Sequence, residues 1–509
     1  MVQIDPTKIQ VQSNAAPAWE QQESFQDLMA ERLRQAPWLI LSAAIHAVIL
    51  LLVVVLLPPK KEPETKVKVE LEMKDTQEVV EPPPPPPPET KTEEVTEDVV
   101  VTETTVTETA EAFDNVDSEV QSKESAFDSN QWNSAVGLGG GAGGAYGGRR
   151  GGRGGKGGGK SYAAAIDAGL KWLANHQDDD GKWDCDQFMK HDDAGSEICN
   201  GPGNAVHDVG VTGLALLAFL GDGSTMRSGP YQKNIKKGVK WLRKQQQENG
   251  LFGSNASHDF IYDHAIAAYA MTEAFGLSEY KLLRKSAQRG INYLESHRNP
   301  YSVWRYQPRD NDNDISVTGW CIMAYKSGQF FGLQASKTAI EMSEVFLDQV
   351  SDPTGLHGYT KQGERSSRKP GDHATKFPVE KGEALTAVGL FCRFFLSQDP
   401  KEKPIMKASA DLLRSKPPKW DEKDGSIDHY YWYYATYALF QYGGSHWKDW
   451  QKKLESAVVK HQHRDKLKKN LFGSWDPIGA WGDDGGRVYS TAILTLTLEA
   501  YYRYSRLVR

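Results

Sequence analysis

The chain has 509 residues, of which 39% are hydrophobic, and it carries a formal net charge of −7. A modest negative charge gives no compositional basis for binding nucleic acid, so nucleic acid is not expected among the partners. Four cysteines in so long a chain exclude a disulfide-dense scaffold. Apolar residues gather near residues 38–57 and again after residue 161, which divides the chain into unequal parts.

The N-terminal part contains one candidate membrane span. Residues 1–36 are polar, whereas residues 37–58 form an apolar run long enough for a bilayer core. Trp38 at its start and Lys60 and Lys61 just after it suit the two membrane interfaces. A cleaved signal peptide is disfavoured because the run lies far from the N-terminus and no small-residue cleavage site follows it. We therefore predict a single transmembrane helix.

Two polar residues lie inside this predicted span. Ser42 and His46 are four residues apart and so share one helix face. A histidine within a membrane is costly and points to function, although an ordinary anchor with His46 near the headgroups is the alternative. Together with Pro37-Trp38 and the Pro-rich acidic stretch that follows, these residues resemble the anchor of TonB-type energy transducers. The resemblance implies coupling to an ExbB/ExbD-like proton-channel motor.

The same resemblance implies a location. Residues 1–36 would be cytoplasmic, the protein would cross the bacterial inner membrane once, and the C-terminal domain would be periplasmic. The Lys and Arg residues around the span do not set this orientation by themselves, because they are not richer on the N-terminal side. The usual C-terminal domain of TonB is absent from this chain.

Two linkers follow the predicted span. Residues 59–136 contain seven consecutive prolines, Pro82 to Pro88, within a strongly acidic stretch, so a stiff and disordered spacer is predicted. Residues 137–160 are rich in glycine and carry four basic side chains, which predicts a flexible swivel. A loose contact of this basic segment with an anionic glycan or nucleic acid is the alternative.

The rest of the chain repeats one unit six times. In its signature, an aromatic residue is followed by glutamine after five positions, by glycine after four more, and by an aromatic after another two. The structural repeat residues are Trp172, Gln177 and Trp183 in the first copy, Trp241, Gln246 and Phe252 in the second, and Gln462 and Trp475 in the last. One unit cannot bury its own apolar face, so the repeat predicts stacked units. The glutamine is expected to bond backbone groups at an adjacent helix end.

A second kind of helix follows each signature. These helices are apolar almost all round and should be buried, whereas the signature helices keep a polar face and should be outer. The predicted starts of the inner helices lie near His207, Asp263, Asp314, Gly382, Asp428 and Gly485. We therefore predict an all-α domain over residues 161–509, a single α/α toroid of six outer and six inner helices, tethered by the disordered linker to one transmembrane helix.

The repeat resembles the QW repeats of squalene–hopene cyclases and, more loosely, the β-subunits of protein prenyltransferases. The whole layout looks like that of the planctomycete-type prenyltransferase/squalene-oxidase-repeat proteins. Class II cyclases protonate an alkene with the middle acid of an Asp-x-Asp-Asp-Thr-Ala motif. Asp312 and Asp314 match the first and middle acids and are the candidate catalytic residues, but Ile315 replaces the last acid and Ser316 the threonine. Capping of a helix N-terminus is the alternative role for these carboxylates.

The zinc chemistry of prenyltransferases is not expected. The Asp-x-Cys-Tyr segment of that family is not found, and Tyr434 falls where its histidine ligand would lie. No metal site and no cofactor are predicted.

A second candidate site consists of polar residues at the starts of the inner helices. In a toroid these starts ring one mouth of the central cavity, where acids, histidines and aromatic residues suit a polar or sugar-like ligand, a metal or acid–base chemistry. Capping and packing are the alternative. The cavity-rim candidates are His207, Asp208, Asp263, His264, Glu383, Asp428 and His429, accompanied by Tyr262, Tyr430, Tyr431, Trp432 and Tyr489.

The four cysteines fall into two pairs. Cys185 and Cys199 flank an acidic loop that contains His191, and outside the cytoplasm they could form a disulfide. Free thiols and a metal site of unrecognised spacing are the alternatives. Cys321 and Cys392 lie within predicted inner helices and are expected in the core.

These observations favour a ligand-binding or scaffold module on a membrane tether, with a ligand in the central cavity or at its rim. One alternative is a divergent terpene cyclase-like isomerase, an intramolecular transferase acting on an isoprenoid. Another is a glycan-active enzyme that uses rim carboxylates, although the sequence does not give their separation. The directions in which the rim carboxylates point should discriminate among these three hypotheses.

Overall fold

The structure, a computed structural model, describes residues 159–369 and 371–503. In these ranges the secondary structure is helical, and extended pairing is confined to two isolated bridges. None of the helices described here has both the length and the apolar character needed to cross a bilayer. The predicted span at 37–58, with Ser42 and His46, the linker at 59–136 and the linker at 137–160 up to residue 158 lie outside the described residues, while residues 159 and 160 begin α5.

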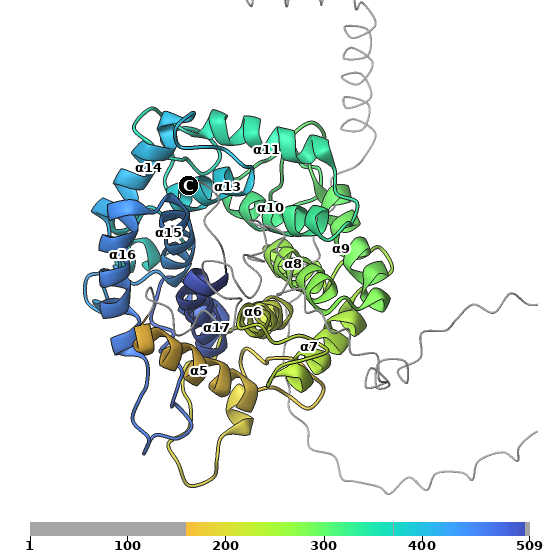
Figure 1. The fold of residues 1–509 in the computed structure, drawn as a ribbon, viewed down its shortest axis with the longest axis vertical. Helices are drawn as coiled ribbons and strands as arrows, with labels where there is room; N and C mark the ends of the chain where they lie inside the picture. Colours follow the sequence, from red (N-terminus) through yellow and green to blue (C-terminus); the bar gives the residue numbers. More distant parts are fainter. Residues whose placement is uncertain (1–158, 370, 504–509) are drawn as a thin grey trace, which may run out of the picture. The chain divides into compact units, whose positions relative to one another are not determined.

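Twelve of the helices form two concentric rings (Figure 1). The outer ring consists of α5 (Gly159–Asn175), α7 (Gln232–Gln245), α9 (Arg284–His297), α11 (Lys337–Val350), α14 (Pro404–Ser415) and α16 (Gly444–Ala457). The inner ring consists of α6 (Asp208–Gly221), α8 (Phe260–Ser278), α10 (Ile315–Phe330), α13 (Ala384–Phe395), α15 (His429–Tyr442) and α17 (Gly482–Arg503). Each inner helix packs on the next, and α17 packs on α6, so the ring is closed. The predicted double ring is confirmed.

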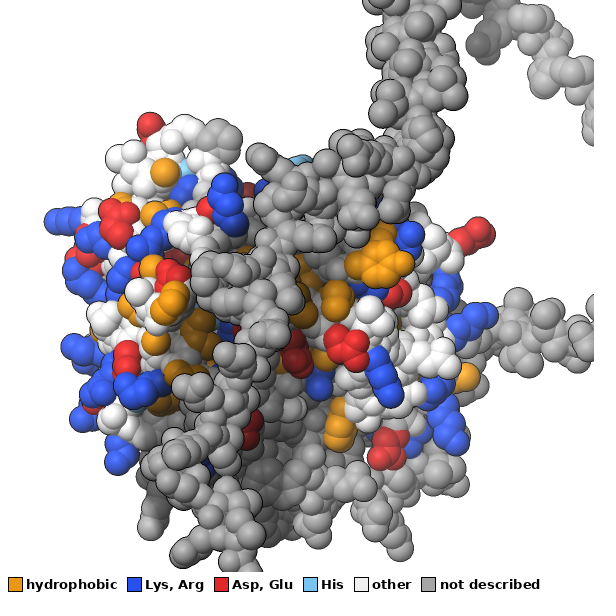
Figure 2. Space-filling model, turned by 90° about the horizontal axis from the view of Figure 1, so that it is seen from above, with side chains coloured by type: hydrophobic (Ala, Val, Ile, Leu, Met, Phe, Trp, Pro, Cys, Tyr) orange, Lys and Arg blue, Asp and Glu red, His pale blue; other side chains and the backbone are white. Residues whose placement is uncertain are grey.

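Burial separates the two rings as the apolar patterns predict. Every residue of α6 from Val209 to Gly221 is buried, whereas α7 buries one face centred on Trp241 and Leu242. Small residues let the inner helices approach closely, because a Cβ at Gly213 would lie 3.1 Å from the backbone nitrogen of Ala267 in α8. On the face shown in Figure 2, charged side chains of both signs are intermixed on the surface. The outer helices therefore present a solvated exterior around an apolar inner ring.

Where the signature glutamine is present, it joins its repeat to a neighbouring outer helix. Gln177 Nε2 donates to Gly181 O at 2.8 Å and to Asn234 O in α7 at 3.0 Å. Gln246 Nε2 likewise donates to the glycine carbonyl of its own copy at 3.1 Å and to Ser286 O in α9 at 3.0 Å. The expectation that this amide bonds the backbone of a neighbouring helix is confirmed.

The signature glycine is required by two features of the junction. Gly181 has a φ of +108°, and a Cβ there would lie 2.2 Å from Lys237 O in α7. Gly473 in the last copy has a φ of +100°, and its Cβ would lie 2.2 Å from Ala168 O in α5. Because only glycine combines a left-handed backbone with such a close approach, the chain turns here against the neighbouring outer helix.

The last copy of the signature closes the ring. Gln462 Nε2 donates to Gly473 O at 2.7 Å and to Ala165 O in α5 at 2.9 Å. Trp172 of the first copy donates its indole N–H to Asn470 O at 2.7 Å. The same motif that links successive repeats thus links the last repeat to the first.

Two middle copies replace the glutamine but keep the junction. Arg298 stands at the glutamine position of the third copy and donates to Ser302 O at 2.8 Å. Trp304 follows at the second aromatic position and is fully buried. In the fourth copy, Ser351 accepts a hydrogen bond of 2.9 Å from the buried guanidinium of Arg393. In both copies an arginine makes hydrogen bonds at the junction where glutamine makes them in the first, second and last copies.

Candidate functional site

The inner ring encloses a cavity of about 460 Å³. Its wall includes residues of the first turns of α6, α8, α10, α13 and α15, residues of α17 near its kink at Gly486, and segments of the loops before these helices. The cavity therefore lies at the starts of the inner helices, where the sequence places the rim candidates. This size falls within the range of ligand pockets, about 300–1,000 Å³.

Ion pairs occupy the polar part of the cavity wall. His207 Nδ1 lies 3.1 Å from Asp263 Oδ2, and His207 Nε2 lies 3.8 Å from Asp259 Oδ2. Lys369 Nζ lies 2.5 Å from Asp484 Oδ1. Each charged side chain named here already has a partner of opposite charge within the wall.

The protonation of the His207–Asp263 pair follows from its surroundings. Burial disfavours the imidazolium, but the hydrogen bond to Asp263 and the nearby carboxylates of Asp263, Asp259 and Asp484 outweigh burial and raise the pKa of His207 to about 9. Burial also raises the pKa of Asp263, while the hydrogen bond from His207 acts in the opposite direction. His207 is therefore an imidazolium at neutral pH, and its hydrogen bond favours the carboxylate form of Asp263.

A group of tyrosines forms the next part of the wall. Tyr306 Oη and Tyr359 Oη lie 2.6 Å apart, and Ser316 Oγ lies 2.7 Å from Tyr430 Oη. Burial raises the pKa of Tyr430, so its hydroxyl stays protonated at neutral pH and can donate or accept. This part of the cavity offers neutral hydrogen-bonding groups on aromatic rings.

The deeper wall is apolar. Leu214 of α6, Ile266 of α8, Trp320 of α10 and Ile493 of α17 line the cavity further along the inner helices than the polar residues do. Trp320 stacks on Tyr433, with ring centroids 5.8 Å apart and an interplanar angle of 12°. The cavity therefore changes from paired charges, through tyrosine hydroxyls, to an apolar surface.

The two candidate catalytic acids do not line this cavity. Asp314 is fully buried as the N-cap of α10, where its Oδ1 accepts from Val317 N at 2.8 Å. Burial raises the pKa of Asp314 to about 7, and Arg305 Nε lies 3.7 Å from its second oxygen. Asp312 has a side chain that is 66% exposed and pairs with Arg305 at 3.1 Å. Asp314 therefore makes the contact expected of a helix N-cap, the alternative to a catalytic acid.

Four of the cavity-rim candidates serve other contacts. Asp208 accepts from Lys182 Nζ at 2.7 Å, and Glu383 pairs with two cations, including Lys416 at 2.5 Å. Asp428 caps α15 by accepting from Tyr431 N at 3.0 Å. His264 is buried and accepts from a backbone N–H of the second signature at 3.0 Å, and burial lowers its pKa to about 3.

Of the remaining rim candidates, one is buried in the core and two line the cavity. His429 is buried and stacks on Trp420, with ring centroids 5.6 Å apart. His207 and Asp263 are the rim candidates that line the large cavity, and of the accompanying aromatic residues Tyr262, Tyr430 and Tyr489 do so. Tyr431 and Trp432 are instead buried in the core. Cavity residues from loops, such as Tyr306, Tyr359, Arg368 and Trp481, were missed because helical periodicity does not place loop side chains.

The four cysteines are free thiols. The disulfide expected between Cys185 and Cys199 is not formed, because the two sulfurs point to different partners. Cys185 Sγ lies 3.5 Å from Gly485 O, and Cys199 Sγ lies 3.0 Å from Asn470 O. Cys321 and Cys392 are buried in α10 and α13, as expected.

The closed double ring of helices and its central cavity define the described part of the chain as an α/α toroid. No model of a known protein family matches the chain, and no curated protein matches it. Solved structures are similar to the chain at low sequence identity. An inactive variant of an α-1,6-mannanase from Salegentibacter sp. HEL1_6, in complex with α-1,6-mannotriose, is 8% identical with a TM-score of 0.47, covering 68% of this chain and 100% of its own.

Two further solved structures show the same level of similarity. An unsaturated glucuronyl hydrolase from Bacillus sp. GL1 is 13% identical with a TM-score of 0.46, covering 68% of this chain and 97% of its own. A type II terpene cyclase from Scytonema is 11% identical with a TM-score of 0.42, covering 67% of this chain and 98% of its own.

Proposed function

We propose that the toroid is a binding module for an uncharged amphipathic molecule of isoprenoid type, held in the central cavity. The observation that carries this proposal is the graded wall, with paired charges and tyrosine hydroxyls near the helix starts and apolar side chains further in. An apolar chain would contact Leu214, Ile266 and Trp320, and a hydroxyl or carbonyl end would reach the tyrosines. Ligand pockets typically combine such an apolar lining with a few polar groups that fix orientation.

The charges of the wall favour a neutral ligand. His207 is paired with Asp263 and Lys369 with Asp484, so a charged headgroup would have to displace a pair that is already formed. Binding is also favoured over proton-initiated cyclisation, because Asp314 caps α10 and is not part of the cavity wall. The glycan-active alternative has less support, because the deeper wall is formed by Ile266, Trp320 and Ile493.

Filling the cavity should abolish binding. With full-length protein in lipid nanodiscs, a photoreactive diazirine analogue of farnesol should label peptides of α8 and α10, as located by mass spectrometry. Replacing Ile266 by tryptophan fills the apolar part of the cavity, and we expect labelling to fall about tenfold or more, a loss of about 1.4 kcal/mol or more.

The matched control is Val345→Trp, which adds the same ring to an outer-helix position that is 47% exposed. This variant should label as the unaltered protein does. Leu214→Trp provides a second filled cavity if Ile266→Trp fails to fold. Undiminished labelling of α8 and α10 in a folded filled-cavity variant would overturn the proposal.

We also propose that this module is displayed in the periplasm on an inner-membrane anchor coupled to an ExbB/ExbD-like motor. The support is the apolar run at residues 37–58 with Ser42 and His46 on one helix face. The acidic, Pro-rich and Gly-rich segments that follow are suited to act as a spacer between the membrane and the toroid.

His46→Leu tests this coupling. Leucine preserves the apolar character of the span, so membrane insertion should be unchanged while co-purification with an ExbB-like protein is lost. Ile45→Leu, one position away, should retain both properties. Co-purification that persists in His46→Leu contradicts a motor-coupled anchor and leaves an ordinary one.

A further inference from the structure

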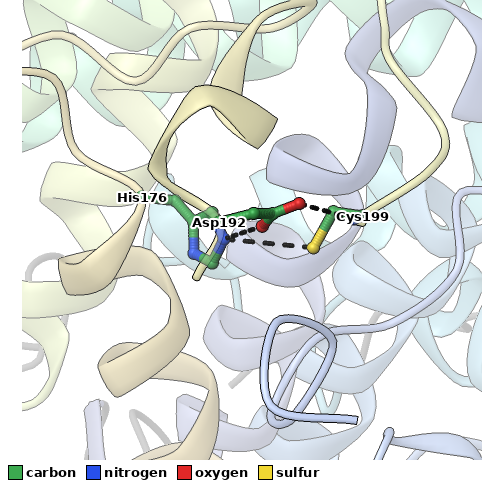
Figure 3. Close-up of side chains that lie close together, drawn as sticks. All are labelled: His176, Asp192 and Cys199. Atoms are coloured by element: carbon green, nitrogen blue, oxygen red, sulfur yellow. Dashed lines mark hydrogen bonds and ion pairs between the residues drawn. The ribbon is translucent and has the colours of Figure 1, made fainter. Parts of the chain in front are cut away.

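Three side chains with metal-binding atoms meet outside the cavity (Figure 3). His176 follows the last turn of α5, Asp192 follows a short helical turn, and Cys199 lies in the loop after it. His176 Nε2 is 3.1 Å from Asp192 Oδ1 and 3.9 Å from Cys199 Sγ, and the three donor atoms all lie within 4.8 Å of one another. His176 and Cys199 are buried, and Asp192 is half-buried with a side chain that is 5% exposed. Three donor atoms of different kinds thus converge from separate segments of the chain on one point.

The backbone orients the histidine toward this meeting point. His176 Nδ1 lies 2.8 Å from Trp172 O, and since a carbonyl only accepts, Nδ1 carries the proton. In the neutral ring Nε2 then presents a lone pair to a carboxylate oxygen and to the sulfur. The 3.1 Å contact between Nε2 and the Asp192 carboxylate accommodates either a proton or a metal ion between the two atoms.

The other two side chains are also fixed by their surroundings. Asp192 Oδ2 accepts from Cys199 N at 2.6 Å, which ties the carboxylate to the segment that carries the thiol. The indole of Trp172 stacks on the imidazole, with ring centroids 4.0 Å apart. Partners of this kind, which hold ligands in place without touching the metal, are typical of metal sites.

We propose that His176, Asp192 and Cys199 bind one zinc ion. Nitrogen, carboxylate oxygen and sulfur are the donors that zinc takes in proteins, and in a tetrahedral site they lie roughly 3.3–3.6 Å from one another. The observed 3.1 and 3.9 Å bracket these separations, so small side-chain shifts complete the site. Three protein ligands leave the fourth position to a water molecule.

Binding replaces the thiol proton. Without metal, Cys199 Sγ lies 3.0 Å from Asn470 O and donates to it, and burial raises the pKa of this thiol to about 12. A zinc ion deprotonates the thiol that coordinates it, so one sulfur–zinc bond forms, the sulfur–hydrogen bond breaks, and the proton passes to solvent. Affinity for zinc therefore rises with pH.

A neighbouring cluster of three carboxylates is less suited to bind a metal ion. Asp184, Asp186 and Asp208 also converge, but Lys182 Nζ lies 2.8 Å from Asp184 and 2.7 Å from Asp208. Lys190 is a second cation on Asp184 at 3.2 Å. Ammonium groups already neutralise that cluster, whereas no lysine or arginine is seen paired with Asp192 among the described residues.

The zinc site lies where the ring closes, which suggests its role. The loop with Asp192 and Cys199 belongs to the first repeat, and it contacts the last repeat through Asn470, whose side-chain Oδ1 accepts from Asp193 N at 2.9 Å. Zinc would fasten this loop to α5 through His176. The ion would thus stabilise the junction between the first and last repeats.

Metal analysis of the full-length protein tests the proposal. Purified from zinc-supplemented cells, the protein should contain about one zinc ion per chain by inductively coupled plasma mass spectrometry. Exchange for Co²⁺ should produce a thiolate-to-cobalt charge-transfer band. Cys199→Ser should abolish the band and lower the zinc content roughly tenfold or more. Loss of a residue that only supports a ligand can already cost about tenfold in affinity, so loss of a ligand should cost at least as much.

Cys185→Ser is the matched control, because Cys185 is equally buried, in the same loop, and its sulfur faces Gly485 O. This variant should keep both zinc and the cobalt band. His176→Ala should behave as Cys199→Ser does, and either variant suffices if the other does not fold. Metal-free wild-type protein without a cobalt band, or equal loss in both cysteine variants, would overturn the proposal.

Discussion

Replacing Trp475 by alanine is expected to lower the free energy of unfolding by about 3–5 kcal/mol. Trp475 is the second aromatic of the last signature and is fully buried. Its indole N–H donates to Val458 O at 2.8 Å, and a Cβ at Gly169 in α5 would lie 3.3 Å from its ring. The substitution therefore removes a large side chain from the contact between the last repeat and the first.

Guanidinium unfolding of the full-length protein at constant detergent concentration measures this loss. Tyr301→Ala is the control, since Tyr301 is 87% exposed and its removal should change the free energy of unfolding by no more than about 0.5 kcal/mol. Trp475→Phe keeps most of the ring volume and should recover much of the loss. If Trp475→Ala costs no more than Tyr301→Ala, the signature does not hold the ring closed.

The fold could be predicted because its determinants are local. Apolar residues at helical spacing distinguish inner from outer helices, and the signature marks each outer helix end. The partner of each glutamine follows less directly, since Gln462 reaches Ala165 across 297 positions. A repeat with a fixed register makes that contact foreseeable, because the last unit must bond the first if the ring closes.

The site could be predicted only in part, for a physical reason. Placing Asp263, Asp314 and Asp428 at the starts of inner helices was correct, but a carboxylate there can either cap the helix or face the cavity. Asp314 and Asp428 accept from backbone N–H groups of their own helices, whereas Asp263 pairs with His207, the residue directly before α6. The choice depends on the neighbouring helix, which a single helix sequence does not reveal.

The sequence left a metal site in the loop of Cys185 and Cys199 open as an alternative, but it did not point to His176 as a third member of the cluster. Spacing rules find ligands that lie close together in sequence, but His176 and Cys199 are separated by an irregular loop. The signal in the sequence is a cysteine and an aspartate in a loop that follows an outer helix and the histidine directly after that helix.

The stability of the toroid should also depend on pH through His207. Its pKa is raised from 6.5 in the unfolded chain to about 9 in the fold, where Asp263, Asp259 and Asp484 face it. A histidine whose pKa is raised on folding contributes stability that is fully present below about pH 6.5 and is lost as pH rises through about 9. The shift corresponds to about 3 kcal/mol.

The comparison of wild type with His207→Gln isolates this effect. The difference in their free energies of unfolding should fall by about 3 kcal/mol between about pH 6 and about pH 10, because the wild-type imidazolium loses its charge. Asp263 ionises at lower pH than His207 does. Because burial raises the pKa of Asp263 from 3.8, its ionisation lowers the stability of the fold in that lower pH range. In an Asp263→Asn background His207 lacks its closest carboxylate, so most of this pH dependence should vanish. If the difference in free energy of unfolding between the two proteins stays constant from about pH 6 to about pH 10, His207 and Asp263 do not form an ion pair. A charged ligand headgroup would then have no ion pair to displace at His207.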